Sequence, residues 1–339
     1  MKFILRSAFG MILTACAIAP AMSDTVIVYS HRQPYLIEPL LDAFTEKTGI
    51  ETKVLYSDKG LAQRLKSEGR NSPADLVLTV DIARLSTYDR MGLLAETSSD
   101  VLEANIPAHL RSDDNTWFGL SKRSRIIVTS KERVPLGEIM RVEDLAKPEW
   151  NGRVCTRPGS HVYNRALMAS LIAHHGEDEA KRWATNLVNN LARKPQGNDR
   201  AQVKAIFEGV CDVAIINNYY YGKMKYSDET AQHDWAKAIN IVFPNQGEED
   251  RGAHINLSGA GIAKYSKNKE AALRLLEFLS APEAQSLYAE INFEYPVNPL
   301  GEVSDELKSW GAFKEDQLPI ETIAKLSKPA QFIINETGW

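Results

Sequence analysis

Three consecutive tyrosines form the part of the sequence with the clearest capacity for chemistry. They lie in the segment Asn217-Asn218-Tyr219-Tyr220-Tyr221-Gly222, directly after the apolar run at 212–216, which we expect to be a strand. Three neighbouring side chains cannot all face one core, and the asparagines beside them indicate a hydrated site. A tyrosine phenolate is a hard, anionic oxygen donor, which suits a small trivalent cation. An aromatic patch without a ligand is the alternative interpretation of this segment.

Tyr163 offers a second donor from a different part of the chain. It follows Pro158-Gly159-Ser160 and opens a stretch at 163–173 with helical periodicity. The N-terminus of a helix presents free backbone N–H groups and the positive end of the helix dipole, which together bind anions. A metal held by Tyr163 would therefore have room for an anion beside it. Taken alone, Tyr163 is equally typical of a partly buried aromatic ring.

The elements that position these tyrosines follow from the alternation of short apolar runs with helical patterns. Ile37, Leu40, Leu41 and Phe44 repeat at helical spacing, and Gly49 ends that helix. Further helices are expected at 163–173, 180–191 and 271–279. We expect strands at 26–29, 54–56 and 75–80, and a second series at 125–129, 154–156 and 212–216. Strands that alternate with helices indicate parallel sheets covered by helices.

Two such series without a flexible linker predict an α/β fold with two lobes, each a mainly parallel sheet flanked by helices. We expect residues 24–121 and 247–299 to form the N-terminal lobe, and residues 122–246 and 300–339 the C-terminal lobe. Ligands of such sheets bind at the carboxyl ends of the strands, so that facing lobes would share one cleft.

Composition and motifs argue against several other classes of function. The net charge of −4 provides no basic field for nucleic acid. The sequence contains no HExxH or GxSxG motif and no carboxylate pair at a fitting position, which argues against a secreted hydrolase.

The N-terminus has the pattern of a secretory signal peptide. Lys2 and Arg6 precede an apolar stretch at 8–19, and small residues then provide a cleavage site, which we place before Asp24. The stretch is too short to span a bilayer. We therefore predict a signal peptide at 1–23 and a periplasmic protein, with a lipoprotein signal ending at Cys16 as the less favoured alternative.

Two cysteines, Cys155 and Cys211, remain in the exported chain. An even number of cysteines in an oxidising compartment favours a disulfide between them. A pair of buried thiols is the alternative. A disulfide would connect the segment before Tyr163 with the segment before Tyr219.

Several motifs together resemble those of the periplasmic ferric-ion-binding proteins of ABC-type iron importers. They are residues 28–35 (VYSHRQPY), 72–75 (SPAD), 117–123 (WFGLSKR), 161–164 (HVYN), 217–222 (NNYYYG), 258–261 (SGAG) and 281–285 (APEAQ), spread over nearly all of the mature chain. The two tyrosines after two asparagines are the most specific. The resemblance implies the type II periplasmic binding fold and a ferric ion bound by Tyr163, Tyr219 and Tyr220, as in the subgroup with a tyrosine-rich site.

The sequence departs from the family at two positions. Gln33 stands where some members have a histidine ligand, and Val80 stands where they have a glutamate. We expect His31 to point elsewhere. Tyr35 lies in the same loop as Gln33, and both are additional candidates for a place at or near the metal. We expect Tyr221 to pack or to form a hydrogen bond.

Three phenolates leave a six-coordinate ion short of donors, and the resemblance suggests a bidentate anion such as carbonate. Arg32 and Arg123 are candidates for holding it, because a guanidinium group binds planar oxyanions through two hydrogen bonds. We expect Arg125 to be a surface charge. Ser160, Asn198 and Asn217 are expected to orient the anion.

The function implied by the resemblance is that of a monomeric solute-binding component, not an enzyme, which delivers ferric iron to the permease in the inner membrane. The alternative is a binding protein of the same fold for a small anion or an organic solute, without a metal. It would use the arginines but would give the three tyrosines no role.

Overall fold

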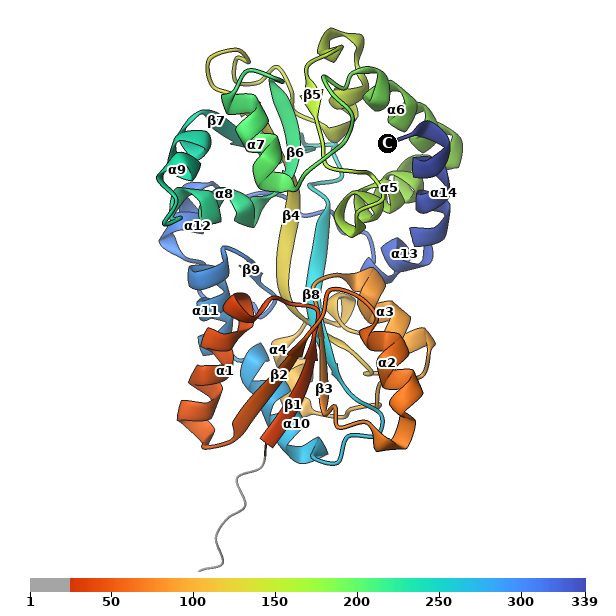
Figure 1. The fold of residues 1–339 in the computed structure, drawn as a ribbon, viewed down its shortest axis with the longest axis vertical. Coiled ribbons are helices and arrows are strands. Elements are labelled where there is room, and N and C mark those ends of the chain that lie inside the picture. Colours follow the sequence, from red (N-terminus) through yellow and green to blue (C-terminus); the bar gives the residue numbers. More distant parts are fainter. Residues whose placement is uncertain (1–24) are drawn as a thin grey trace, which may run out of the picture.

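The first lobe is built on strands from the N-terminal part of the chain (Figure 1). The computed structural model describes residues 25–339, and the predicted signal peptide at 1–23 lies outside them, as does Cys16. β1 (Thr25–Ser30) pairs in parallel with both β2 (Glu51–Tyr56) and β3 (Leu76–Thr79). The helices of this lobe are α1 (Pro34–Thr48), α2 (Leu61–Glu68), α3 (Ile82–Arg90), α4 (Asp100–Asn105), α10 (Lys269–Ser280) and α11 (Pro282–Asn292).

The second lobe contains shorter strands and more helices. β5 (Val154–Cys155) pairs in parallel with β6 (Val213–Asn217), and β7 (Ile239–Val242) lies at the edge. The helices of this lobe are α5 (Val162–His175), α6 (Glu177–Asn189), α7 (Asp199–Phe207), α8 (Asn218–Lys225), α9 (Thr230–Lys237), α12 (Asp305–Ser309), α13 (Ile320–Lys325) and α14 (Ser327–Thr337). Single turns of 3-10 helix occur at Gly69–Asn71, Ala108–Leu110 and Pro148–Trp150, and a longer one occurs at Val142–Ala146.

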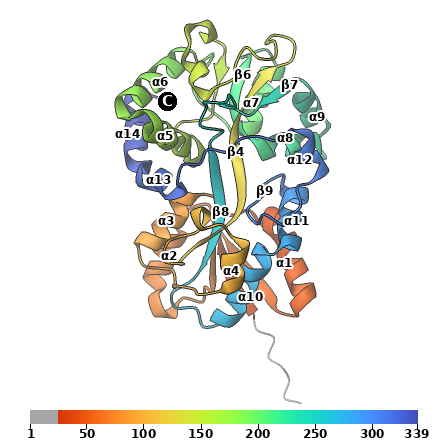
Figure 2. The same cartoon turned by 180° about the vertical axis from the view of Figure 1, so that it is seen from behind.

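Two long strands connect the lobes, as Figures 1 and 2 show from opposite sides. β4 (Phe118–Ser130) pairs with β8 (Ile255–Ile262) along its first half and with β6 along its second half. The change of partner falls between Ser124 and Arg125. β9 (Tyr295–Pro296) pairs with β4 beside this point. β4 therefore belongs to both lobes and connects their sheets.

The strand pairing is mixed, whereas we expected mainly parallel sheets. The strands follow the order β2-β1-β3-β8-β4-β6-β5, and only β1–β2, β1–β3 and β5–β6 are parallel pairs. The other pairs are antiparallel because β4 and β8 cross between the lobes in opposite directions. The expectation rested on the alternation of strands with helices, which does not reveal the direction in which the long strands β4 and β8 run.

Most of the expected elements are present at their expected positions. α1 buries Ile37, Leu40, Leu41 and Phe44, and it ends at Gly49 with φ of 73°, a conformation that glycine adopts readily. The helices expected at 163–173 and 180–191 are α5 and α6, and the strand expected at 212–216 is β6. Among residues 25–339, no helix is both long enough and apolar enough to span a bilayer.

Candidate functional site

A cavity of about 310 Å³ lies between the lobes, at the carboxyl ends of β1, β3, β5 and β6. Most of its lining side chains are polar or charged. From the first lobe they include Arg32, Gln33, Tyr35 and Arg84, and from the second lobe Arg157, His161, Tyr163, Asn198, Arg200, Tyr219, Tyr220 and Lys223. Arg123 of β4 and Ser258 of β8 contribute to the lining from the crossing strands. The cavity lies where the alternation of strands and helices predicted a shared cleft.

Three phenol groups converge in this cavity from the starts of two helices. Tyr163 lies in the first turn of α5, and Tyr219 and Tyr220 lie in the first turn of α8. The hydroxyl oxygens of Tyr163 and Tyr219 are 3.1 Å apart. The rings of Tyr219 and Tyr220 stack with their centroids 4.4 Å apart. Tyr221 turns away, and its ring contacts Trp310 at a centroid distance of 5.5 Å, so it packs as expected.

The start of α8 is fixed by contacts on several sides. The Asn218 side chain accepts a hydrogen bond from the backbone N–H of Ser124 at 2.8 Å and donates one to the carbonyl of Phe293 at 3.0 Å. A side-chain carbon at Gly222 would collide with the ring of Phe293, so only glycine fits there without a shift of the helix. The hydrogen bonds and the close packing together hold the tyrosine pair in place.

A disulfide joins Cys155 to Cys211, with the two Cα atoms 5.9 Å apart. Cys155 ends β5, which leads to Tyr163, and Cys211 precedes β6, which leads to Tyr219. The bond therefore connects the two segments that carry the tyrosines, close to where each segment leaves the sheet.

Arginine side chains surround the ring of Tyr163. The guanidinium carbons of Arg123, Arg125 and Arg157 lie 5.5, 5.9 and 5.2 Å from the centroid of that ring. Arg200 lies 5.1 Å from the centroid of the Tyr220 ring. At these distances a guanidinium group is attracted to the face of an aromatic ring.

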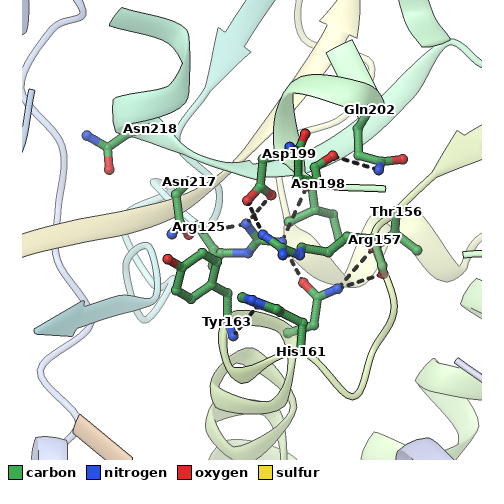
Figure 3. A network of polar contacts seen from close by, with 12 residues as sticks. Arg125, Thr156, Arg157, His161, Tyr163, Asn198, Asp199, Gln202, Asn217 and Asn218 are labelled. Atoms are coloured by element: carbon green, nitrogen blue, oxygen red, sulfur yellow. Dashed lines mark hydrogen bonds and ion pairs between the residues drawn. The ribbon is translucent and has the colours of Figure 1, made fainter. Parts of the chain in front are cut away.

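Arg125 is buried, so the expectation that it is a surface charge was wrong. Its side chain is 2% exposed and forms an ion pair of 2.7 Å with Asp199, which also pairs with Arg157 at 2.7 Å. Figure 3 shows Asp199 bound to both guanidinium groups, which lie next to the ring of Tyr163. The sequence offered no sign of this burial, because the partner carboxylate lies on α7, far along the chain.

The polar residues expected to orient an anion have different positions. Asn217 accepts a hydrogen bond from Arg125 at 3.2 Å and is not among the residues that line the cavity. Ser160 is exposed and does not line the cavity. Asn198 lines the cavity, although its side-chain oxygen caps α7 by accepting from the N–H of Ala201 at 3.0 Å.

Arg32 and Arg123 meet at one hydroxyl group at the floor of the cavity. Their guanidinium groups donate hydrogen bonds to Oγ of Ser258 at 2.9 and 3.2 Å. Arg32 also pairs with Glu294 at 2.8 Å, and Arg123 donates to the carbonyl of Val80. Two cationic groups are thus held side by side, and Val80 contributes to the site through its backbone.

The first strand–helix loop places Gln33, Tyr35 and also His31 at the cavity. Gln33 and Tyr35 both line the cavity, and Tyr35 is 53% exposed. Both ring nitrogens of His31 are occupied, by the carbonyl of Ser57 at 2.7 Å and the hydroxyl of Tyr88 at 2.9 Å. His31 therefore lines the cavity, which differs from the expectation that it points elsewhere, but both of its ring nitrogens already have hydrogen-bond partners.

The cavity is positively charged in the absence of a ligand. Six cationic side chains line it against two carboxylates: Arg32, Arg84, Arg123, Arg157, Arg200 and Lys223 against Asp58 and Glu294. Burial, together with Tyr163 and Tyr220, raises the pKa of the Tyr219 phenol well above its ordinary value. Burial also raises the pKa of Tyr220. Both phenols are therefore neutral near pH ~7 in the empty cavity.

Sequence reasoning did not identify several cavity residues. Arg84, Arg157, Arg200 and Lys223 carry no motif, and their positions depend on how the lobes face one another. His161 belonged to a recognised motif, but its part in the site was not foreseen. Its Nδ1 accepts a hydrogen bond from the N–H of Tyr163 at 3.3 Å, and burial together with Arg157 lowers its pKa to about 3.

Two α/β lobes with a polar cavity between them define a ligand-binding protein of the periplasmic type. The chain belongs to the family of bacterial extracellular solute-binding proteins, whose match covers residues 58–315. It is 40% identical over 321 residues to iron uptake protein A1 of Synechocystis, covering 94% of this chain and 89% of that protein.

Solved structures of related proteins have the same fold. The apo ferric ion-binding protein A of Pasteurella haemolytica is 49% identical, with a TM-score of 0.87 over 93% of this chain and 98% of that one. The Trichodesmium IdiA (FutA) protein in complex with iron and citrate is 41% identical, with a TM-score of 0.88 over 93% of this chain and 99% of that one. These similarities confirm the type II periplasmic binding fold.

Proposed function

We propose that this protein is the periplasmic solute-binding component of an ABC-type importer that captures ferric iron and delivers it to the inner-membrane permease. The observation that carries the proposal is the convergence of Tyr163, Tyr219 and Tyr220 in one cavity. The names of the similar iron uptake and ferric ion-binding proteins support it.

Phenolates from the three tyrosines would provide the protein donors to the ferric ion. Each phenol must lose its proton to bind, so that iron binding releases protons and the affinity falls as the pH falls. The neutral state of Tyr219 and Tyr220 in the empty cavity is consistent with this coupling. Gln33 and Tyr35 lie in the cavity lining as further donor candidates.

An anion such as carbonate would fill the remaining positions around the ion. Arg32 and Arg123 are the proposed holders, and Arg157 and Arg200 join them as cations of the same cavity. The excess of positive charge would oppose entry of a bare trivalent cation and favour an ion that arrives or stays with an anion. Three phenolates and a chelating anion would leave no open position for a substrate, which argues against an enzyme.

The mature protein would act as a monomer in the periplasm without a nucleic acid partner. We propose cleavage after the signal peptide at 1–23, and lobes formed by 24–121 with 247–299 and by 122–246 with 300–339. A binding protein for a small anion or an organic solute is the competing function. It would use the same cations, but three converging phenols would then have no role.

The test is a titration of the iron-free protein with a ferric chelate in the presence of bicarbonate, followed by visible spectroscopy. Phenolate-to-iron charge transfer should give a coloured complex with one ion per protein. The Tyr219→Phe/Tyr220→Phe variant should lose the colour, whereas Tyr221→Phe, the neighbour that contacts Trp310, should keep it. A colourless wild-type complex, or unchanged affinity in the double variant, would show that the proposal is wrong.

A pH titration of the coloured complex tests the anion separately. Colour should be lost as the pH falls, because protons compete with iron for the phenolates. Arg123→Ala should lose its colour at a higher pH than the wild type. Added bicarbonate should reduce this difference in pH between the two proteins. If the wild type and Arg123→Ala lose colour at the same pH, both with and without bicarbonate, Arg123 and the anion have no role in iron binding. The proposal that the tyrosines are ligands would not be affected by that result.

A further inference from the structure

A second cavity, about 400 Å³ in volume, lies on the outside of the molecule where the two lobes meet. α3 of the first lobe forms one wall, and α5 and the α13–α14 junction of the second lobe form the other. Figures 1 and 2 both show α3 directly below α13. Five cationic side chains line this cavity, which we name the basic groove: Arg84, Arg90, Arg165, Lys325 and Lys328. No aspartate or glutamate of residues 25–339 lines it.

The cations of the basic groove have almost no counter-charges. Arg84 forms no hydrogen bond or ion pair with any described residue. Arg90 donates only to the hydroxyls of Ser86 and Thr87, at 2.8 and 3.3 Å. Within residues 25–339, Lys325 alone among these cations pairs with a carboxylate, that of Glu321 at 3.6 Å, and its side chain is 76% exposed.

Arg165, on the opposite wall, has only neutral partners among the described residues. Its guanidinium group donates to the carbonyl of Ser160 at 3.3 Å and to Oε1 of Gln331 at 3.1 Å. Asp58 lines an adjoining cavity with Arg84 and Arg165, but forms an ion pair with neither within the described chain. The positive charge of the groove is therefore not cancelled by its surroundings.

Several other arginines of the described chain pair with carboxylates, unlike those of the basic groove. Arg64 pairs with Glu68, Arg141 with Asp250, and Arg251 with Glu143. The whole chain carries a net charge of −4, so a concentration of unpaired cations does not follow from its composition. Like charges gathered on two facing walls repel one another, and a bound anion removes that repulsion.

We propose that the basic groove binds a free multivalent oxyanion of the phosphate type, at a site that adjoins the cavity of the tyrosines and shares Arg84 with it. Guanidinium groups of Arg84, Arg90 and Arg165 offer paired N–H donors to the oxygens, and Lys325 and Lys328 add point charges. Because the cations come from both lobes, the bound anion connects α3 with α13 and α14. The tyrosines play no part in this site, so the inference does not depend on the proposed iron function.

Calorimetric titration of the iron-free protein with inorganic phosphate and with pyrophosphate, at constant ionic strength set by chloride, tests the proposal. The groove variant is Arg90→Gln/Lys325→Gln/Lys328→Gln, which leaves Arg84 and the iron cavity intact. The control variant, Arg182→Gln/Lys237→Gln/Lys308→Gln, removes the same charge elsewhere on the surface. Lys237 matches Lys325 closely, with a side chain 77% exposed and a carboxylate at 3.6 Å.

The groove variant should bind pyrophosphate about tenfold more weakly or worse, since each lost contact is a charge-assisted hydrogen bond. The control variant should stay within about twofold of the wild type. Equal affinity in the wild type and the groove variant would overturn the proposal, as would equal weakening in both variants. A second measurement is sedimentation of the protein with phosphatidylglycerol vesicles. If the wild type sediments with the vesicles, the groove variant does not, and neither binds phosphate in solution, the groove binds lipid headgroups and the proposal of a free oxyanion is wrong.

Discussion

Asp199 holds the two arginines behind the tyrosine cluster, and its removal should destabilise the protein strongly. Its side chain is fully buried and forms ion pairs of 2.7 Å with both Arg125 and Arg157. Asp199→Asn keeps the shape but removes the charge, which leaves two nearly buried guanidinium groups without a counter-charge. Breaking a buried ion pair by removing one partner costs about 3–5 kcal/mol. The loss of two charge-assisted hydrogen bonds, each worth about 1.5–3 kcal/mol, gives a similar cost in the free energy of unfolding.

A second aspartate provides a matched control on the surface of the same lobe. Asp212 also pairs with two arginines, Arg133 and Arg153, at 2.5 and 2.7 Å. Its side chain is 17% exposed, and those of the arginines are 36% and 34% exposed. Solvent screens such pairs, so that Asp212→Asn should cost about 1 kcal/mol or less.

Urea unfolding followed by tryptophan fluorescence and circular dichroism measures both losses on the same scale. We expect Asp199→Asn to lower the free energy of unfolding by several times the loss in Asp212→Asn, with similar m-values. If the two variants lose equal free energy, burial of the Asp199 pairs is not what sets their strength. If Asp199→Asn is as stable as the wild type, Asp199 does not hold the arginines.

Three further predictions concern other parts of the same framework. Reduction of the Cys155–Cys211 disulfide, whose ends are 56 residues apart, should lower the free energy of unfolding by about 4 kcal/mol. Coinciding urea curves for oxidised and reduced protein would contradict this. Burial, with nearby arginines, lowers the pKa of His254 to about 3. As the pH falls, this histidine therefore becomes protonated in the unfolded chain before it does so in the folded protein. The free energy of unfolding should fall from pH ~6.5 towards pH ~3 by up to about 1.4 kcal/mol per pH unit. His254→Gln should flatten this dependence in urea titrations, and an unchanged slope would exclude His254 as its source. Gly222→Ala should cost about 1–3 kcal/mol through collision with the Phe293 ring and should weaken the iron colour. A variant with wild-type stability and spectrum would refute the packing argument.

The tyrosine cluster could be predicted from the sequence because its position follows from local pattern. An apolar run ends at Asn217 and a glycine follows at Gly222, so the tyrosines between them lie at a strand end. Tyr163 follows Pro158-Gly159-Ser160 in the same way, at the start of α5. The ordinary rule for the location of ligands in α/β sheets then brings the two segments together.

The crossing strands were harder to predict, because their polar residues are buried by pairing between distant segments. Residues 121–125 of β4 are Ser-Lys-Arg-Ser-Arg, which reads as a surface segment, yet Ser121, Arg123 and Arg125 are nearly fully buried. β8 and β6 cover this strand, and the carboxylates that balance its arginines come from α7 and from the residue before α3. Neither partner can be found from a pattern within the strand.

Under the proposed function, the balance of charge in the cavity favours phenols over carboxylates as metal donors. Asp199 and Glu294 show what a carboxylate does in these surroundings, because each is bound to an arginine. A carboxylate in place of Tyr219 would be ionised in the empty protein and would pair with the nearby guanidinium groups. That pairing would occupy both the metal donor and the groups available to an anion. A buried phenol remains neutral beside the same arginines, and a highly charged ion can still remove its proton. Under the proposed function, the cavity would therefore keep its positive charge available until iron and an anion are present together.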